Sequence, residues 1–587
     1  MMIETGKTDI LIIGTGGAGL FAALHAKQAN PDLDVTLAVK GLVGKCGCTR
    51  MVQGGYNVAL AAGDSVERHF MDTIVGGKWL PNQDLAWRLC EKAVERVNEL
   101  ENEVGCFFDR NPDGSLHQKA FAGQSFDRTV HKSDLTGIEI INRLMEKVWA
   151  AQVNKLEEHR AIRLIRAADG SGLAGAMLID MRRGTYRYIA AKAILLATGA
   201  GPTMYRYHTP SGDKTCDGLN MALDLGLGLR DMEMVQFHRT GLLGGPDTRM
   251  TGTVLEEGLR GAGGHLVNGE GERFMFGYHE AGERATRDIV SRGIYQEMRE
   301  GRTTPMGGVY ISMAHLGPDH VAERFPGMVK RCRDCGFDLA GGLVEVVPTA
   351  HYMMGGVSFS ADTSTEIDGL FAAGEDCGGV HGANRLGGNG VANSTVFGGI
   401  AGDSMAAYVK TRKTWRDADQ AELDNAVAEA EYPFSKPSGD LHGLREALAH
   451  TMWDDVGVMR DAAGLERGMK TVSGYAKALM DMGVSSQNRA FHMEWHEWLN
   501  VKSLTRISEV IALAALGREN SRGAHYREDF PDTGALEESA NTVIHAKGDK
   551  LELSLEKVDF SIVKPGESLI DDMAGMPSPI VAGGISS

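Results

Sequence analysis

The sequence predicts an α/β fold in which a discontinuous Rossmann-like dinucleotide-binding domain carries an inserted α+β domain and is followed by a helical domain and a C-terminal β hairpin. Three observations indicate this: three apolar strands that each end in a glycine turn, a later stretch with helical spacing of apolar residues, and an alternating pattern near the C-terminus. A chain of 587 residues has room for such an arrangement.

The first glycine element forms a predicted βαβ unit. Asp9–Ile13 is predicted as a buried strand, residues 14–19 as a turn with the pattern G-x-G-x-x-G, Leu20–Gln28 as a helix and Val35–Val39 as a second strand. Such a turn lets the backbone approach a pyrophosphate, whose charge the helix N-terminus favours. An NAD site would carry Asp or Glu after the second strand, where this chain has Val39-Lys40, so free NAD is disfavoured.

Two further strand–glycine elements come much later, at residues 193–201 and 369–375. Elements so far apart can build one dinucleotide fold only if a separate domain is inserted between them. We place that insertion at roughly 246–354, where Pro, charge and irregular apolar spacing interrupt the βα rhythm.

The C-terminal third has a different pattern. Leu441–Met459 and Ala462–Met482 show the apolar spacing of helices. Residues 541–563 alternate apolar and polar side chains around a turn-like segment at 547–550, which predicts a terminal hairpin whose alternation continues to Ile562.

Composition excludes several classes of protein. With 61 Lys and Arg against 78 Asp and Glu, the net charge of −17 argues against a nucleic-acid or anionic-membrane partner. The 76 glycines have no collagen-like period and indicate tight turns and close backbone approaches to a large ligand. Eight cysteines do not form a disulfide framework, and we find no membrane span, signal peptide or twin-arginine leader. We therefore expect a cytoplasmic protein without direct membrane insertion.

Five long motifs lie in the middle of the chain, and a sixth follows at Ser521-Arg-Gly-Ala-His-Tyr-Arg-Glu-Asp-Phe-Pro-Asp532. The five are Asp231-Met-Glu-Met-Val-Gln-Phe-His-Arg-Thr-Gly241, Glu257-Gly-Leu-Arg-Gly-Ala-Gly-Gly264, Arg284-Ala-Thr-Arg-Asp288, Pro348-Thr-Ala-His-Tyr-Met-Met-Gly-Gly356 and His381-Gly-Ala-Asn-Arg-Leu-Gly-Gly-Asn389. From about residue 8 to 532 the chain resembles the flavoprotein family of succinate dehydrogenase, fumarate reductase and L-aspartate oxidase.

The resemblance implies an FAD-binding domain over 1–245 and 355–416, a mobile capping domain over 246–354, a helical domain over 417–535 and a C-terminal segment over 536–587. It also implies that Glu375 contacts the ribose hydroxyls of FAD. The full set of implied cofactor-binding residues is Gly14, Gly16, Gly17, Ala18, Gly19, Lys40, Gly54, Gly55, Thr198, Gly199, Asp217, Glu375 and Arg385.

In the family, hydride passes between flavin N5 and one carbon of a C=C or C–C bond of a small dicarboxylate, and an arginine exchanges the proton at the other carbon. The matching arginine here is Arg287. A guanidinium with a pKa above ~12 is a poor acid unless it belongs to a relay, and Glu257 and Arg260 match the relay positions of the family.

His238, His351 and Arg385 match the residues that hold the substrate carboxylates. A dianion needs cationic or donor groups at both ends, and Arg offers a bidentate fork. Gln53 and Phe121 match positions that face substrate and flavin.

Two departures from the family pattern bear on the chemistry. Where complex-bound members carry a histidine that is covalently linked to FAD, this chain has Cys48, so we expect non-covalent FAD; a cysteinyl thioether is the alternative. In the family the covalent link raises the flavin potential and favours succinate oxidation, so its loss favours reduction or a more easily oxidised substrate.

The second departure is Glu256, which stands where the family has a threonine that binds a substrate carboxylate. A carboxylate facing a dianion repels it. Either Glu256 points elsewhere, or the substrate is not plain succinate or fumarate. Residues 389–393 also depart from the Asn-Ser-Leu-Leu pattern of the family.

The leading hypothesis is a flavoprotein subunit that exchanges electrons with an iron–sulfur partner, because this chain has no cluster motif of its own. Cys332 and Cys335 lack a second pair and are expected as free thiols on a helix, and we predict no metal site. The alternatives are a stand-alone oxidase of the L-aspartate oxidase type and a non-catalytic flavin relay. Through partner subunits, a peripheral position at the inner face of a membrane is an alternative location.

Overall fold

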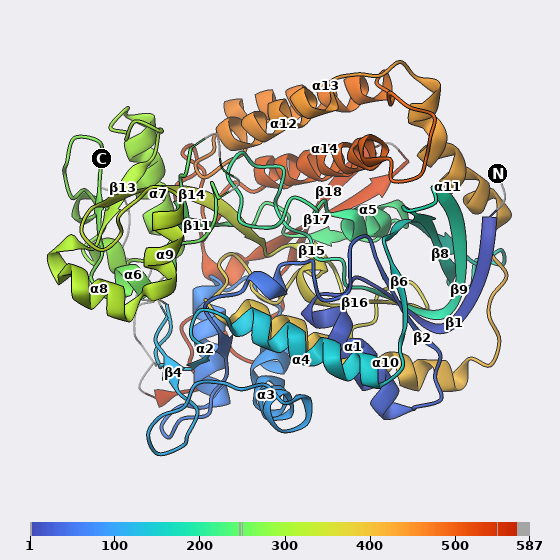
Figure 1. Cartoon of the computed structure of the whole chain (residues 1–587), viewed down its shortest axis with the longest axis horizontal. Helices are drawn as coiled ribbons and strands as arrows, with labels where there is room; N and C mark the ends of the chain where they lie inside the picture. Colours follow the sequence, from blue (N-terminus) through green and yellow to red (C-terminus); the bar gives the residue numbers. More distant parts are fainter. Residues whose placement is uncertain are drawn as a thin grey trace.

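The computed structural model describes residues 3–121, 123–245, 248, 250–256, 258–548 and 550–571. Its central sheet has the strand order β6–β2–β1–β9–β8–β7, with β16 paired to β9 (Figure 1). The strands are β1 (Ile3–Ile13), β2 (Val35–Val39), β6 (Asn154–Glu157), β7 (His159–Arg166), β8 (Leu173–Asp180), β9 (Thr185–Leu196) and β16 (Leu370–Ala372).

The three predicted glycine elements meet at one edge of this sheet. Strands β1, β9 and β16 run parallel, and Leu196 pairs with both Ile13 and Ala372 at their carboxyl ends. The glycine turns that follow the three strands therefore lie side by side, at the edge where open α/β sheets bind ligands. The prediction that distant segments assemble one such fold is confirmed.

The first βαβ unit is longer than predicted at its start. Strand β1 begins at Ile3 instead of Asp9, because residues 3–8 pair in parallel with β9. Helix α1 (Gly17–Ala29) begins within the glycine motif itself, whereas β2 has the predicted bounds.

Helices α1 and α10 (Asn389–Thr411) pack with their backbones in close contact. A Cβ atom on Gly398 would lie 2.6 Å from the carbonyl oxygen of Ala18, and one on Gly402 would lie 2.4 Å from that of Ala22. Only glycine permits this approach. It brings the N-terminal end of α10 beside the glycine motif, where a ligand would bind.

Shorter elements complete this part of the chain, with β3, β5 and β4 forming a small antiparallel sheet. These elements are α2 (Val66–Gly76), α3 (Gln83–Glu99), α4 (Thr136–Ala150), α5 (Asp217–Asp224), β3 (Tyr56–Asn57), β4 (Gln118–Lys119) and β5 (Thr129–Val130).

The inserted segment has a hydrophobic core of its own, formed by buried residues between Leu242 and Val346. Strands β11 (Val235–Leu242) and β14 (Leu343–Met353) lead into and out of it as an antiparallel pair, and Figure 1 shows the segment at one end of the molecule. Its other elements are α6 (Gly258–Gly261), β12 (His265–Val267), α7 (Arg287–Arg299), β13 (Val309–Ser312), α8 (Pro318–Arg324) and α9 (Pro326–Asp334). The boundaries 246–354, like those of the other domains, stay a prediction.

The predicted helices of the C-terminal third are present, with earlier ends. They are α12 (Leu441–Asp455) and α13 (Ala462–Met480). Two helices without a sequence prediction, α11 (Gln420–Glu431) and α14 (Met493–Gly517), lie in the same part of the chain, and α12 to α14 run along the top of Figure 1. Asp461 caps α13 by accepting a hydrogen bond from the amide of Gly464. Within the described residues, no helix is both long and apolar enough to cross a membrane.

The terminal hairpin consists of β17 (Ala540–Lys547) and β18 (Lys550–Lys557), and Lys547 pairs with Lys550 across the predicted turn. The alternating pattern overestimated its length, since residues 558–562 follow β18. There the ring of Phe560 packs against that of Trp79, with 6.2 Å between the centroids. Burial against another element explains these apolar residues without a strand.

A buried ionic cluster ties the hairpin to the turn between β10 (Leu229–Arg230) and β11. Arg518 donates hydrogen bonds to Asp231 and Glu233, and these carboxylates also accept from Asn541 and Thr542 respectively. Burial and the neighbouring carboxylate of Glu233 raise the pKa of Asp231. The cluster fixes the chain just before β11. Strand β15 (Gly356–Val357) pairs with β10 and completes the sheet to which β10 and the hairpin belong, with the strand order β15–β10–β17–β18.

Candidate active site

A cavity of about 210 Å³ lies at the carboxyl edge of the central sheet, where the inserted segment meets it. The structure brings most of the predicted site residues together around this chamber, although they come from six or more separate stretches of the chain. Those that line it are Gly16, Gly17, Ala18, Gln53, Gly54, Gly55, Phe121, Gly199, His238, Arg287, His351, Glu375 and Arg385.

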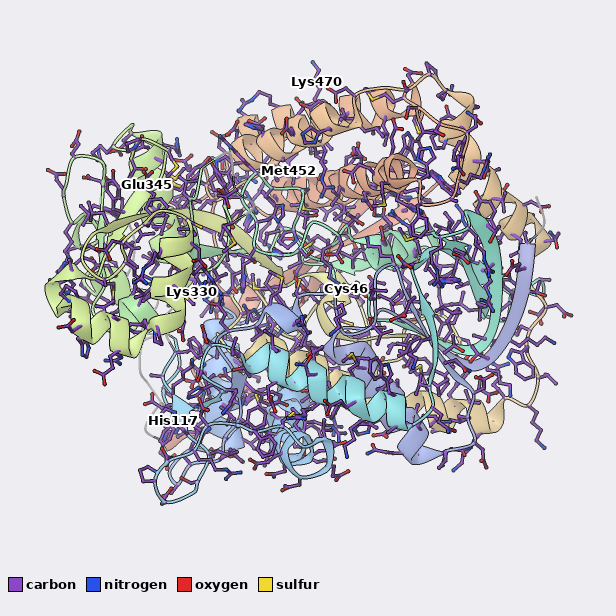
Figure 2. The ribbon with its side chains drawn as sticks, in the orientation of Figure 1. Cys46, His117, Lys330, Glu345, Met452 and Lys470 are labelled. Atoms are coloured by element: carbon purple, nitrogen blue, oxygen red, sulfur yellow. The ribbon has the colours of Figure 1, made fainter. Side chains whose placement is uncertain are left out.

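A smaller cavity of about 50 Å³ shares Gly16, Gly199 and Lys214 with the chamber. Cys46, which lines this smaller cavity, is marked in Figure 2 between the inserted segment and the central sheet. The predicted residues Gly14, Gly16, Lys40, Thr198, Gly199 and Asp217 line the smaller cavity.

Among the described residues, two of the predicted ones line neither cavity. Gly19 lies in α1, and Arg260 lies in α6, where it is buried and donates a hydrogen bond of 2.8 Å to the carbonyl oxygen of Glu283. Glu257 lies outside the described residues. The position of the relay carboxylate relative to Arg287 therefore stays a prediction.

The glycines of the first motif have separate tasks. A Cβ atom on Gly14 would lie 2.0 Å from the carbonyl oxygen of Ala197, and one on Gly19 would lie 2.0 Å from that of Gly14. These two glycines allow strand, turn and helix to pack closely. Beyond the chain neighbours of Gly16, the nearest atom that an added Cβ would meet in the described part of the chain is Thr49 Oγ1 at 3.7 Å, so the Cβ would project into the cavity. Gly16 thus leaves the backbone accessible to a ligand.

The smaller cavity is polar. Lys40 Nζ lies 2.9 Å from Asp217 Oδ2, and Arg160 Nη2 lies 2.9 Å from Asp217 Oδ1. Although burial opposes ionisation, Arg160 and Lys40 hold the pKa of Asp217 well below its usual value. Thr15 Oγ1 is buried at the cavity wall and has no hydrogen-bond partner among the described residues. An elongated polar ligand would satisfy this hydroxyl.

Arg287 is the first residue of α7 and is buried at the wall of the chamber. Its Nη1 donates a hydrogen bond of 3.0 Å to Gln236 Oε1. The Gln236 amide nitrogen in turn donates to Asn384 Oδ1 and to the carbonyl oxygen of Arg385. Both ends of the amide are therefore fixed, and its oxygen faces the guanidinium.

His238 and His351 lie on the paired strands β11 and β14, with 5.4 Å between their ring centroids. The backbone amide of Thr240 donates to His238 Nδ1 at 3.3 Å. Since Nδ1 accepts, Nε2 carries the proton in the neutral ring and can act as a donor. Thr209 Oγ1 lies 2.7 Å from His351 Nδ1 and orients the second ring.

Arg385 adds a cation to the same wall. Its guanidinium lies 4.5 Å from the ring centroid of Tyr352, a cation–π contact that fixes its plane. Nearby, Glu375 accepts a hydrogen bond from the amide of Met353, and burial raises the pKa of Glu375 to about 7. The chamber thus collects arginine and histidine donors in a protein that is acidic as a whole.

Phe121 packs between two glycines. A Cβ atom on Gly54 would lie 2.8 Å from Phe121 Cζ, and one on Gly387 would lie 3.2 Å from the same ring and 3.0 Å from Arg287 Nη2. The absence of side chains at 54 and 387 lets the ring and the guanidinium share this wall.

Glu256 does not point away from the site: it lines the chamber, and its Oε1 lies 3.0 Å from Lys119 Nζ. Gln53 faces Arg331, whose Nη2 lies 3.0 Å from the amide oxygen when the amide is oriented to accept. Both contacts join the predicted FAD-binding segment to the predicted capping segment.

The cysteines singled out from the sequence, at the chamber and at α9, are free thiols. Cys48 lines the chamber, and burial raises its pKa to about 12. Cys332 lies on α9 and Cys335 follows it, both as free thiols as predicted.

Sequence reasoning missed several residues of the site. Asp376, which accepts hydrogen bonds from the amide and hydroxyl of Thr198, follows Glu375 directly and could have been found in the third glycine element. Gln236 lies inside a quoted motif, but nothing in the pattern showed its contact with Arg287. Lys214 donates to the carbonyl oxygen of Thr198 from an irregular segment, and Lys119 belongs to the two-residue strand β4. Neither segment carries a pattern from which its contact could have been predicted.

Comparison with known proteins gives matches along almost the whole chain. The FAD binding domain family matches residues 9–391, and the family described as fumarate reductase flavoprotein C-term matches residues 445–569. An uncharacterized FAD-dependent oxidoreductase of Methanocaldococcus jannaschii is 40% identical over 560 residues, which cover 95% of this chain and 99% of that protein.

Two further relatives carry more specific descriptions. A subunit of the fumarate reductase (CoM/CoB) of Methanothermobacter marburgensis is 39% identical over 538 residues, which cover 91% of this chain and 96% of that protein. Among solved structures, the FrdA chain of Escherichia coli quinol fumarate reductase matches with a TM-score of 0.90 and 30% identity, covering 98% of this chain and 100% of that one.

The contacts of the first glycine motif predict the effect of Gly19→Ala. The added methyl group would collide with the carbonyl oxygen of Gly14, so the turn must move and the purified protein should contain less flavin, measured as the ratio of absorbance at about 450 nm to protein. Gly474→Ala is the matched control, because Gly474 lies in α13 and, apart from its own stretch of helix backbone, no atom of the described residues lies within 4 Å of the added Cβ. Full flavin content in Gly19→Ala would contradict the assignment of the first glycine motif to cofactor binding.

Proposed function

Because the chain belongs to the fumarate reductase and succinate dehydrogenase family of flavoproteins, we propose that Arg287, His238, His351 and Arg385 carry out the reaction of that family in the chamber described above. The protein is an FAD-dependent oxidoreductase that acts on the CH–CH bond of a small dicarboxylate. The observation that carries the residue assignment is the hydrogen bond that holds the buried guanidinium of Arg287 at the chamber wall.

The residues of the two cavities fit FAD. Gly16 leaves an open backbone edge, Thr15 offers a buried hydroxyl, and Lys40 with Asp217 gives the smaller cavity a polar end. When bound, FAD supplies the hydride donor or acceptor of the reaction. The predicted cofactor-binding residues would hold it across both cavities, and Glu375, on the wall of the larger cavity, would contact its ribose hydroxyls.

His238, His351 and Arg385 would bind the two substrate carboxylates. The tautomer set by Thr240 gives His238 a donor at Nε2, and the fork of Arg385 suits a carboxylate. Donors at both ends would align the carbon–carbon bond. Gln53 and Phe121 would close the chamber around it, which excludes water and strengthens each charged contact.

Arg287 would exchange the proton at the second carbon. A protonated guanidinium is a weak acid, so a relay must restore its charge state after each transfer. We assign that relay to Glu257 and Arg260, the latter buried beside Glu283. Gln236 would keep the guanidinium aimed into the chamber while the proton moves.

We also propose an iron–sulfur protein as the electron partner. The sequence has no cluster motif, and the relative from Methanothermobacter marburgensis is described as one subunit of its enzyme. For the location we propose the cytoplasm, or, through partner subunits, a peripheral position at the inner face of a membrane. Without the family's histidyl link to FAD, we assign reduction as the favoured direction.

One observation favours a second candidate, an oxidase for an amino dicarboxylate: Glu256 lines the chamber and could meet a substrate ammonium. Lys119 already forms an ion pair with the Glu256 carboxylate, so we propose a dicarboxylate without an amino group as the substrate in preference to an amino dicarboxylate.

Replacing the catalytic arginine tests the assignment. Arg287→Ala should lower kcat for fumarate reduction by ~100-fold or more, because general-acid groups contribute about 10²–10⁴ in rate, while flavin content stays unchanged. The measurement is fumarate-dependent oxidation of a reduced viologen dye. Arg284→Ala is the control, since Arg284 is exposed in the same segment. Normal turnover in Arg287→Ala would show the proton-relay assignment to be wrong.

The linkage of FAD is testable by acid precipitation. A thiol whose pKa is raised to about 12 by burial is scarcely ionised near neutrality and forms no thioether readily. We therefore expect all flavin in the supernatant, with the same result for Cys48→Ser. Yellow flavin that pellets with the wild-type protein and is lost from Cys48→Ser would establish a cysteinyl link instead.

A further inference from the structure

The ion pair between Lys119 and Glu256 is the feature of the chamber that the reaction itself does not explain. Glu256 stands at the chamber wall, and its carboxylate is mostly buried, with 15% of the side chain exposed. Lys119 lies in β4, on the opposite side of the junction between the two predicted domains. Its Nζ also lies 5.8 Å from the ring centroid of Phe121, itself a chamber residue.

A partly buried carboxylate at this wall has a direct electrostatic consequence. Without a partner, it would repel a dianionic substrate at short range, where little water screens the charges. With Lys119 at 3.0 Å, the pair is neutral as a whole, and the lysine ammonium holds the carboxylate in a fixed direction. Binding of a dicarboxylate at this wall would thus depend on Lys119, a residue outside the chamber lining.

Neighbouring contacts hold Glu256 in reach of Lys119. Arg331 on α9 donates a hydrogen bond of 2.9 Å to the carbonyl oxygen of Val254, two residues before Glu256, and its Nη2 faces Gln53. A Cβ atom on Gly327, also on α9, would lie 2.4 Å from Asp134 Oδ2. Helix α9 therefore links the segment that carries Glu256 to the FAD-binding segment.

We propose that Lys119 is a specificity-determining residue that acts through Glu256: it neutralises the carboxylate, admits an unsubstituted dicarboxylate and keeps a substrate ammonium from that position. This inference rests on the proposed function of the chamber. It concerns which dicarboxylates bind, and not the hydride or proton transfer.

The proposal makes the effect of Lys119 conditional on Glu256. In Lys119→Met the carboxylate loses its partner, and the dissociation constant of a dicarboxylate should rise about tenfold or more, whereas kcat and flavin content stay within about twofold of wild type. The double variant Lys119→Met with Glu256→Thr removes both charges and should restore binding. Affinity for L-aspartate relative to succinate should rise in Lys119→Met, because Glu256 then becomes available to an ammonium.

The experiment uses the FAD-loaded full chain. Binding of succinate, malonate and L-aspartate is followed by the change in flavin absorbance, and KM and kcat for fumarate are measured alongside. Lys132→Met is the matched control. Lys132 forms an ion pair with Asp109 at 3.1 Å, and this pair is more exposed than the pair of Lys119 with Glu256 and is not part of the chamber lining. The replacement of Lys132 should leave substrate binding unchanged.

Two results would overturn the inference while leaving the proposed function intact. Lys119→Met with wild-type affinity and selectivity would show that the pair has no role in substrate choice. A double variant as impaired as Lys119→Met would show that Lys119 acts on the substrate directly. Failure of the proposed function itself would look different, because the wild-type protein would then give neither an absorbance change nor turnover with any dicarboxylate.

Discussion

The hydrogen bond from Arg287 to Gln236 is the interaction on which the chemistry of the chamber depends. It joins the first residue of a helix in the inserted segment to the strand that leads into that segment, and the same glutamine is fixed by Asn384 and by the backbone of Arg385. The side-chain amide of Gln236 therefore holds Arg287, the proposed proton donor, in a fixed position relative to Arg385, which is proposed to bind a substrate carboxylate. Since a misplacement of about 1 Å can cost two orders of magnitude in rate, this coupling is a functional requirement.

Glycine makes the arrangement sterically feasible. The turn after β1 approaches the end of β9 at Gly14, and α10 approaches α1 at Gly398 and Gly402, at distances that a Cβ atom would forbid. Gly54 and Gly387 do the same for Phe121 and Arg287. The glycine surplus of the sequence thus corresponds to two different needs, the cofactor edge of the sheet and the wall that faces the substrate.

The fold and the cofactor edge could be predicted because they follow from local patterns: a strand, a glycine turn and a helix in order, or apolar residues at helical spacing. The strand β1 was predicted too short because its first residues, 3–8, are held by pairing with β9, which no local pattern reports. Residues 558–562 alternate as a strand would, but packing against Trp79 takes the place of pairing.

The site was predictable only where long motifs carried it. Arg287, His238, His351 and Arg385 line one chamber, as the motifs led us to expect, whereas Gln236, Asp376 and Lys119 act through contacts between distant segments. Glu256 shows the limit most clearly. A glutamate at this position departs from the family pattern, which the sequence alone shows. Whether its carboxylate repels the substrate depends on Lys119, which lies 137 residues away in the sequence.

In the proposed reaction, this chamber transfers reducing equivalents from bound flavin to an unsaturated dicarboxylate. The most direct measurement is stopped-flow absorbance of the FAD-loaded protein, reduced with dithionite under anaerobic conditions and then mixed with fumarate. We expect the oxidised flavin spectrum to return when fumarate is added with no oxygen present. Flavin that stays reduced with fumarate but is reoxidised rapidly by oxygen would contradict it and would identify an oxidase instead.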